Sequence, residues 1–538
     1  MSHPGTRIGI YGWGLVAPRS PDIASFERNL EATDSWLTPF HGFGPSNFLV
    51  GMPEFDFARY RPWVDARFEP RKFPQLQSKM GPNVQYALGA FIQSLEQNEG
   101  MEELLQELGT EAHVYVGTGL GDLSVAYDVA VHYHHAQRHW DRFWCQEAHH
   151  PELAEYRRAS AGDRERLRSE IEAPEDPADH RPEEPEHDEL MNDWFGFWVE
   201  RSKGLAAYLG ELRAIESENV GADVEASKGH VIRRKLAARR RLNERYRCPP
   251  EPWTSVDAKL LWNIGNIPAA QISMLGGIVG PAIAPVAACS TFGVALKLAV
   301  NAIQLGQARA VVVGATDPPP HPLSVAAFFN ARVLAHDGSV SKPLTGMRGT
   351  HVAGGACVWI VGDSDYMRGR GMRPLGLEIL SVGMTSDADH IITPSEEGPR
   401  AAIRQALAEA GVEPADVTAW DMHATATPGD WAELLSALAV LPDAQAITAR
   451  KGTFGHGMAA CGGWELTAQH LGLARGKLHP VHLSPDELHP LVQPHLMRLV
   501  KDAPVTVDGG VCGKISMGVG GINCCVVSRA WSPAPPRC

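Results

Sequence analysis

Ala287-Ala288-Cys289-Ser290-Thr291 follows the apolar run from Ile278 to Val286 and precedes Gly293-Val-Ala-Leu-Lys-Leu-Ala-Val-Asn-Ala-Ile303, whose apolar residues recur at helical spacing. The pattern predicts a strand, a tight turn that carries a thiol, and a helix that begins beside that thiol. Because the positive end of a helix dipole stabilises a thiolate, we expect the pKa of Cys289 to be lowered. Taken alone, a cysteine in an Ala-Cys-Ser tripeptide is more often a buried core residue. Whether Cys289 is catalytic therefore depends on the rest of the chain.

Two histidine segments follow downstream. In the first segment, a short apolar stretch ends in Trp420-Asp-Met-His423-Ala-Thr425-Ala-Thr427-Pro-Gly-Asp430. This pattern predicts that His423 lies at the end of a strand. Lys451-Gly-Thr-Phe-Gly-His456-Gly-Met-Ala-Ala-Cys-Gly-Gly-Trp-Glu465 surrounds its histidine with small residues, which let the backbone approach a substrate closely. One cysteine and two glycine- or alanine-flanked histidines at strand-to-helix junctions indicate nucleophilic catalysis.

These segments resemble, in order and spacing, the motifs of β-ketoacyl synthases, which are condensing enzymes of the thiolase superfamily. The family's T-A-C-S-T/S-G corresponds to Ala287 to Phe292, its H-G-T-G-T-P-x-G-D to His423 to Asp430, and its K-x-x-x-G-H-x-x-x-A-A-G-x-x-E to Lys451 to Glu465. The terminal G-F-G-G-x-N is matched by Gly518-Val519-Gly520-Gly521-Ile522-Asn523. The resemblance covers nearly the whole chain except about residues 130–250.

The resemblance implies an α/β protein with a thiolase-like duplicated fold of five layers, αβαβα, in which two five-stranded sheets are sandwiched among helices. We expect the N-terminal half to span residues 1–340 and the C-terminal half residues 341–538. Within the second half, the sequence predicts a helix over about 397–410 that ends at Gly411 in a left-handed conformation. Family members normally form homodimers, or heterodimers with a related subunit.

The stretch from about 130 to 250 departs from the family and predicts a large, mostly helical insertion. Residues 151–190 hold 14 acidic and 6 basic residues, whereas residues 228–247 hold 9 basic residues and one acidic residue, so the two blocks could pair. The aromatic cluster around Trp194 could anchor a helix on the body of the enzyme. A basic group is either a dock for an acidic acyl carrier protein or a solvated helix face: Arg233, Arg234, Lys235, Arg239, Arg240 and Arg241.

The composition excludes several other classes of protein. The formal net charge of −14 argues against nucleic-acid binding. The chain shows neither an apolar run of membrane-spanning length nor a secretory leader, and nine cysteines, an odd number, favour a reducing cytoplasm. A histidine-rich stretch lacks a recognised ligand spacing, so we expect no metal site there: His132, His134, His135, His139, His149 and His150.

The resemblance also implies a reaction and the residues that perform it. Cys289 takes an acyl group from a phosphopantetheine thioester on an acyl carrier protein. His423 and His456 donate hydrogen bonds to a malonyl-type thioester that loses carbon dioxide and condenses with the acyl group. Lys451 and Glu465 support the histidines, and the backbone N–H groups of Cys289 and Val519 form the oxyanion hole. No tightly bound cofactor is expected.

Six residues are expected around the substrate: Phe292, Val519, Gly520, Asn523, Thr425 and Thr427. Val519 replaces the family's gating phenylalanine, Phe292 replaces a glycine, and Ala424 and Ala426 replace two more glycines. These departures favour polyketide or specialised fatty-acid biosynthesis. They leave two alternatives, a non-elongating ketosynthase-like acyltransferase and a chain-length-factor-like partner subunit, and the retained Cys289 counts against the second.

Overall fold

The computed structural model describes residues 6–44, 47–184, 186–218, 224–507 and 509–531. The chain forms two compact units, one comprising residues 1–125 and 261–538 and the other residues 126–260. The second unit corresponds to the predicted insertion. Among the described residues, no helix combines the length and the apolar character that a membrane crossing requires.

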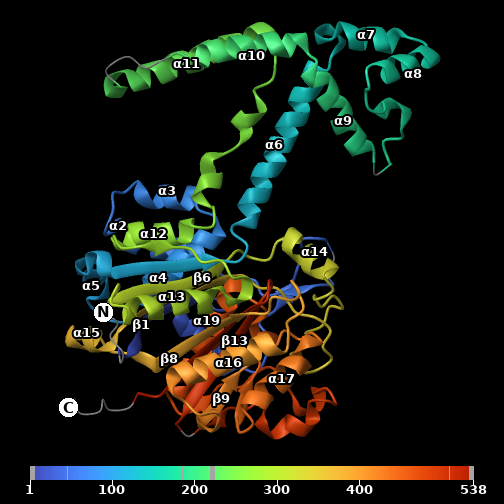
Figure 1. Cartoon of the computed structure of the whole chain (residues 1–538). Helices are drawn as coiled ribbons and strands as arrows, with labels where there is room; N and C mark the ends of the chain where they lie inside the picture. The colour runs from blue at the N-terminus through green and yellow to red at the C-terminus, as the bar shows by residue number, and fades with distance from the viewer. Residues whose placement is uncertain (1–5, 45–46, 185, 219–223, 508, 532–538) are drawn as a thin grey trace. The chain divides into compact units, whose positions relative to one another are not determined.

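The main sheet of the larger unit has ten strands among the described residues, and their order divides them into two groups of five. Figure 1 labels several of these strands and the helices around them. The first group has the order β1 (Ile8–Val16), β7 (Gly355–Asp363), β6 (Ala310–Asp317), β4 (Ala112–Thr118) and β5 (Ala282–Ile283). The second has the order β8 (Leu375–Ser386), β14 (Ile522–Arg529), β13 (Val511–Gly518), β9 (Val417–Asp421) and β10 (Ala446–Thr448). Among the described residues, the strand pairing that joins the two groups is that of β1 with β8, through Ile8 and Ile10.

The two groups repeat one topology. When the strands of each group are numbered along the chain, both groups have the order 1-5-4-2-3. In both groups the first strand pairs antiparallel with the fifth, and the fifth pairs antiparallel with the fourth. The fourth strand pairs parallel with the second, and the second pairs parallel with the third. This repetition confirms the predicted duplication, which sequence identity between the halves does not reveal. Because β7 pairs with β1 and β6, the first group extends beyond residue 340, and the domain division expected there stays a prediction.

Helices separate and cover the two groups of strands. Helices α13 (Thr291–Gln304) and α19 (Met458–Leu473) share one buried core with β1, β6 and β7 on one side and with β8 and β14 on the other. Helices α4 (Pro82–Leu95) and α12 (Ile267–Gly276) cover the outer face of the first group. Helices α16 (Glu397–Ala410) and α17 (Gly429–Val440) cover the second group. These are the five layers of a thiolase-like fold.

Short elements complete the larger unit. The helices are α1 (Ile23–Asn29), α2 (Arg61–Asp65), α3 (Lys72–Lys79), α5 (Met101–Glu107), α14 (Pro322–Asn330), α15 (Ser364–Gly369) and α18 (Lys451–Phe454). Two small ribbons pair β2 (Thr38–Pro39) with β3 (Leu49–Val50) and β11 (Lys477–Leu478) with β12 (Val505–Thr506).

The smaller unit is helical, as predicted. Its helices are α6 (Leu123–Trp144), α7 (Pro151–Arg158), α8 (Ala161–Glu170), α9 (His187–Glu200), α10 (Lys203–Glu216) and α11 (Val224–Tyr246). Trp194 and Trp198 pack with Tyr156 and Leu153, so the aromatic cluster forms a core of the insertion itself. The expectation that this cluster anchors a helix on the body of the enzyme stays a prediction.

The charged blocks of the insertion pair differently from the expectation. Two basic residues of α11 form ion pairs with Glu216 at the end of α10 and with Glu218 just after it, Lys235 with the first and Arg234 with the second. Among the described residues, no such ion pair joins the basic block to the acidic block over residues 151–190. Arg239 forms a bidentate ion pair with Glu251, whose side chain is buried. The hydroxyl of Tyr208 donates to the same carboxylate at 2.5 Å. Arg239 therefore stabilises the unit, while Arg233, Arg240 and Arg241 are exposed.

Candidate active site

Cys289 lies in a single 3₁₀ turn, Ala288–Ser290, directly before α13. The hydroxyl of Thr291 donates to the carbonyl of Ala288 at 2.7 Å, and the hydroxyl of Ser290 donates to the carbonyl of Ile522 at 2.8 Å. Ala288 itself adopts a left-handed conformation with φ of 47°. The turn and helix agree with the prediction, but the preceding strand is only two residues long because β5 covers Ala282–Ile283.

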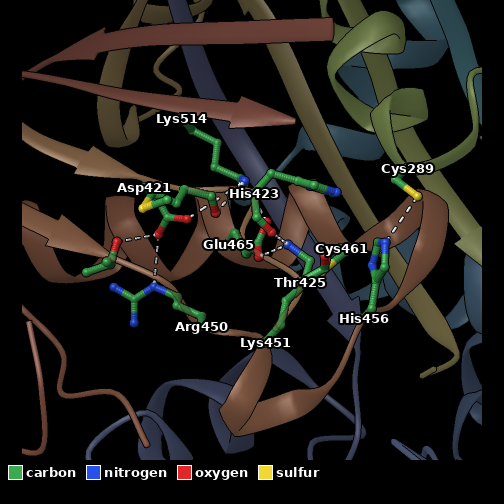
Figure 2. Close-up of polar contacts among 12 residues, drawn as sticks. Cys289, Asp421, His423, Thr425, Arg450, Lys451, His456, Cys461, Glu465 and Lys514 are labelled. Carbon is green, nitrogen blue, oxygen red and sulfur yellow. Dashed lines mark hydrogen bonds and ion pairs between the residues drawn. The ribbon is translucent and has the colours of Figure 1, made fainter. Parts of the chain in front are cut away.

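The two histidines converge on the thiol from the other half of the fold. His423 follows β9 by two residues, and His456 lies between α18 and α19. The Nε2 atom of His456 lies 3.1 Å from the Sγ atom of Cys289, and the two imidazole rings meet edge to face at 5.3 Å (Figure 2). Potential ligand atoms of all three side chains lie within 4.8 Å of one another. The structure thus brings together the trio identified from the sequence.

Burial governs the protonation of the trio. Loss of water, reinforced by the charge of Lys451, holds the pKa of both imidazoles well below their usual range, so both are neutral. Burial also raises the pKa of Cys289 to about 11, although Lys451 and the backbone N–H of Val519 act to lower it. The predicted lowering of this pKa is therefore wrong for the substrate-free protein. The resting trio is a thiol beside two neutral imidazoles.

Lys451 and Glu465 lie beneath the histidines in a buried ionic network (Figure 2). The Lys451 ammonium forms an ion pair with Glu465 at 2.7 Å and donates a hydrogen bond to the carbonyl of His423. A second ammonium, that of Lys514, lies 2.7 Å from the other oxygen of Glu465. Burial alone would raise the pKa of Glu465, but the two lysines outweigh it and hold that pKa below its usual range.

Four further residues of this region were missed by the sequence analysis besides Lys514. Asp421 accepts from Arg450 at 3.1 Å, and both side chains are buried. Glu433 accepts the backbone N–H of His423 at 2.5 Å, and burial raises the pKa of Glu433 to about 8. Asp430 accepts the backbone N–H groups of Thr425 and Ala426. Asp430 and Glu433 follow His423 closely in the sequence and accept hydrogen bonds from the backbone of the turn there. That short spacing is the sequence signal that could have found these two residues.

A cavity of about 210 Å³ opens beside the trio. Its lining includes four of the six predicted substrate-binding residues, Thr425, Thr427, Val519 and Asn523. Phe292 lies elsewhere: its side chain is fully buried between the layers, with its ring 5.1 Å from that of Trp359. Gly520 does not line the cavity either, but adopts φ of 94° in the glycine loop and donates its N–H to the carbonyl of Ile391 at 2.7 Å. The roles assigned to these two residues stay predictions.

Asn523 orients the glycine loop through a neighbouring loop. Its side-chain amide donates to Asp387 at 2.6 Å, and the backbone N–H of Asp387 donates to the carbonyl of Gly521 at 2.8 Å. Within the described residues, the trio is the sole group of three or more histidine, cysteine or acidic side chains close enough to share a metal ion. The histidine-rich stretch on α6 does not form such a group in that part of the chain.

Known proteins resemble the chain over both halves. A model of the β-ketoacyl synthase N-terminal domain matches residues 223–363, and a model of the C-terminal domain matches residues 377–483. The chain belongs to the β-ketoacyl synthase family of the thiolase superfamily. The family matches include the segments that carry Cys289, His423 and His456.

Two curated β-ketoacyl synthase relatives illustrate the likeness. The chain is 32% identical over 281 residues to the 3-oxoacyl-[acyl-carrier-protein] synthase homolog of Saccharomyces cerevisiae, covering 49% of the chain and 62% of that protein. It is 30% identical over 278 residues to 3-oxoacyl-[acyl-carrier-protein] synthase 2 of Rhizobium meliloti, covering 50% of the chain and 65% of that protein. The chain thus spans less than two thirds of the length of these relatives.

Solved structures share the fold of this family member. A β-ketoacyl synthase from Burkholderia phymatum superposes with a TM-score of 0.67 at 16% identity, covering 98% of this chain and 100% of the other. The ishigamide ketosynthase/chain length factor superposes with a TM-score of 0.65 at 18% identity and the same coverage. A type II polyketide ketosynthase in complex with its acyl-carrier protein gives a TM-score of 0.61 at 16% identity, again with 98% and 100% coverage.

Proposed function

We propose that the chain is a β-ketoacyl synthase that performs a decarboxylative Claisen condensation between an acyl-cysteine and a malonyl-type thioester. The observation that carries the proposal is the convergence of Cys289, His423 and His456 at one cavity. Each of these side chains is buried, so their contacts to a reacting group act in a medium of low dielectric constant.

The first step is acyl transfer to Cys289. Its Sγ atom forms a bond to the thioester carbonyl carbon, while the S–H proton passes to Nε2 of His456, 3.1 Å away. The carbon–sulfur bond to phosphopantetheine then breaks, and the departing thiolate takes up the proton. The backbone N–H groups of Cys289 and Val519 both point toward the sulfur, which suits them to hold the oxyanion of the tetrahedral intermediate.

The second step is decarboxylation of the malonyl-type thioester. The bond between its carboxylate and Cα breaks, carbon dioxide leaves, and the electron pair moves onto the thioester oxygen as an enolate. Neutral His423 and His456 each have one N–H to donate to that oxygen. The enolate carbon then attacks the acyl carbonyl carbon on Cys289, the carbon–sulfur bond breaks, and the cysteine thiolate takes up a proton from water to restore the thiol. The product is a β-keto thioester on the carrier protein.

The proposed partners are an acyl carrier protein and a second ketosynthase-like subunit. The solved complex of a related fold with its acyl-carrier protein supports the first, and the exposed Arg233, Arg240 and Arg241 offer charge for an acidic protein. Strand β5 lies at the edge of the sheet, and the apolar side chains of Val279, Ile283 and Val286 around it are exposed. An exposed edge strand with apolar neighbours suits the interface of a homodimer or heterodimer. We place the enzyme in the cytoplasm, where the nucleophilic thiol stays reduced.

The pathway that we propose is polyketide or specialised fatty-acid biosynthesis. Val519, at the position of the family's gating phenylalanine, is 46% exposed and lines the cavity. A smaller side chain at this point leaves a wider entrance beside Cys289 than a phenylalanine would. That geometry supports an acyl group different from the straight chains of housekeeping fatty-acid synthesis.

The test is incubation with an acyl-pantetheine thioester and a malonyl carrier protein, followed by intact mass and carbon dioxide release. Condensation yields a carrier-bound β-keto thioester together with carbon dioxide. Acylation of Cys289 without carbon dioxide release would support the acyltransferase alternative. Absence of any acylation would support the partner-subunit alternative and refute the proposal.

A further inference from the structure

Lys514 is buried in the middle of the molecule, close to the histidine pair. It lies on β13, and its side chain is 1% exposed. Its ammonium is 2.7 Å from one oxygen of Glu465, while the ammonium of Lys451 is 2.7 Å from the other. One carboxylate therefore faces two ammonium groups, and Lys514 also lies 3.8 Å from Asp421.

The two lysines also donate hydrogen bonds to the carbonyl groups of consecutive residues. Lys451 donates to the carbonyl of His423, and Lys514 donates to the carbonyl of Met422 at 3.3 Å. Lys514 is fixed in turn by the carbonyl of Ile515 at 2.6 Å. The backbone that presents the imidazole of His423 is thus held at two adjacent points by two ammonium groups.

We propose that Lys514 is a second positioning residue for the condensation: with Lys451 it fixes the backbone of His423 and places a positive charge near the imidazole. The inference rests on the proposed function. Both effects favour a neutral imidazole in a fixed orientation, which is the form that donates a hydrogen bond to an enolate.

Other charged or titratable groups face His423 from every neighbouring element. They lie on the 3₁₀ turn before α13, on β9, on α17, on α18 with its flanking residues, and on α19: Cys289, Asp421, Asp430, Glu433, Arg450, Lys451, His456 and Glu465. Asp421 lies 3.8 Å from Lys514 but also accepts from Arg450. Removal of the Lys514 charge therefore leaves Glu465 and Lys451 as one balanced pair and makes the imidazolium form of His423 easier to reach.

Lys451 and Lys514 differ in their reach toward the nucleophile. The charge of each lysine lowers the pKa of His423 and of His456, and the charge of Lys451 also lowers the pKa of Cys289. We therefore expect loss of Lys514 to alter the histidines more than the thiol. Loss of Lys451 should alter both.

The experiment compares Lys514→Met and Lys451→Met with the wild-type protein and with Lys477→Met, a surface control whose ion pair with Glu31 is partly exposed. We expect Lys514→Met to reduce malonyl decarboxylation about 10-fold or more at pH 7. Fewer positive charges stabilise the imidazolium, so activity in this variant should fail at a higher pH on the acidic side. The pH profile of Cys289 alkylation should change little from that of the wild type, whereas Lys451→Met should shift it upward.

A second readout works without turnover. In protein labelled at histidine, the NMR titration of His423 should move to higher pH in Lys514→Met. A decarboxylation profile and a titration that both match the wild type would overturn the inference. If the wild-type protein does not decarboxylate malonyl thioesters, the proposed function fails, and the titration still decides the role of Lys514. Because loss of one partner of a buried ion pair destabilises a protein strongly, Lys514→Gln replaces Lys514→Met if the latter does not fold.

Discussion

The Nε2 atom of His456 lies 3.1 Å from the Sγ atom of Cys289, across an interface between the two duplicated halves of the fold. Cys289 precedes α13 of the first half, and His456 precedes α19 of the second. These two helices pack against each other in the central layer. The site therefore exists only when the duplicated halves are packed together.

Cys289→Ala should abolish acyl loading, because it removes the atom that forms the thioester. The measurement is intact mass after incubation with an acyl-pantetheine thioester. Cys248→Ala, in the helical insertion, is the matched control and should load at the wild-type rate. Loading of Cys289→Ala at the wild-type rate would remove this cysteine from the mechanism.

The alkylation rate of Cys289 should keep rising with pH far above neutrality. With a pKa of about 11, the thiolate is a minor species at pH 7, and its fraction grows about tenfold per pH unit up to that value. The measurement is iodoacetamide labelling from pH 6 to pH 10, with Cys289→Ala subtracting the other thiols. A rate that reaches its plateau below pH 8 would contradict the dominance of burial over the helix dipole.

His423→Ala should damage decarboxylation much more than acyl loading, because His456 remains beside the thiol. Loss of one hydrogen-bond donor to a developing oxyanion typically lowers a rate by about 100-fold or more. The measurement is carbon dioxide release from malonyl carrier protein, with acyl loading followed in parallel. Equal losses in both steps, or no loss in either, would refute the separate roles of the histidines.

Ala426→Gly should stabilise the protein, because Ala426 has φ of 61°, a conformation that strains a residue with a Cβ atom. The strain relieved exceeds the added backbone entropy by about 0.5–1 kcal/mol. Ala424 is buried and has an ordinary φ, so Ala424→Gly is the matched control and should destabilise. Thermal unfolding of both variants provides the test. A lower midpoint for Ala426→Gly would show that its methyl group contributes more by packing than it loses by strain.

The sequence alone was sufficient to identify Cys289, His423 and His456, because each of them lies in a local motif at a turn. It also predicted α16 and its end: the helix covers Glu397–Ala410, and Gly411 adopts φ of 62°. Turn motifs and helix-ending glycines can be recognised in the sequence without knowledge of the fold. The duplicated strand order was taken from the family resemblance rather than from the residues.

The part of the buried ionic network formed by Lys514 and Asp421 was missed, because it arises from strand pairing between distant segments. Lys514 on β13 lies in register with Asp421 on β9, and Thr448 on β10 lies in register with Asp421 from the other side. A lysine between Gly513 and Ile515 gives no sign of such a neighbour. The burial of Phe292 could not be predicted for a related reason, because its packing against Trp359 in the interlayer core joins segments that are distant in the sequence.

The pKa of Cys289 was mispredicted because the sequence reveals the helix but not the depth of burial. The helix dipole, Lys451 and the N–H of Val519 all favour a thiolate. Loss of water opposes them and wins. In the proposed reaction, that balance favours proton transfer to His456 during the attack over a preformed thiolate.

The most direct measurement is a single-turnover reaction of protein already acylated at Cys289 with malonyl carrier protein labelled with ¹³C at the methylene carbon. The account predicts that the acyl mass disappears from Cys289 as carbon dioxide is released, and that the labelled carbon lies between two carbonyl groups in a lengthened β-keto thioester. Acyl groups that leave Cys289 for a carrier thiol, with the label still in intact malonyl thioester, would contradict it.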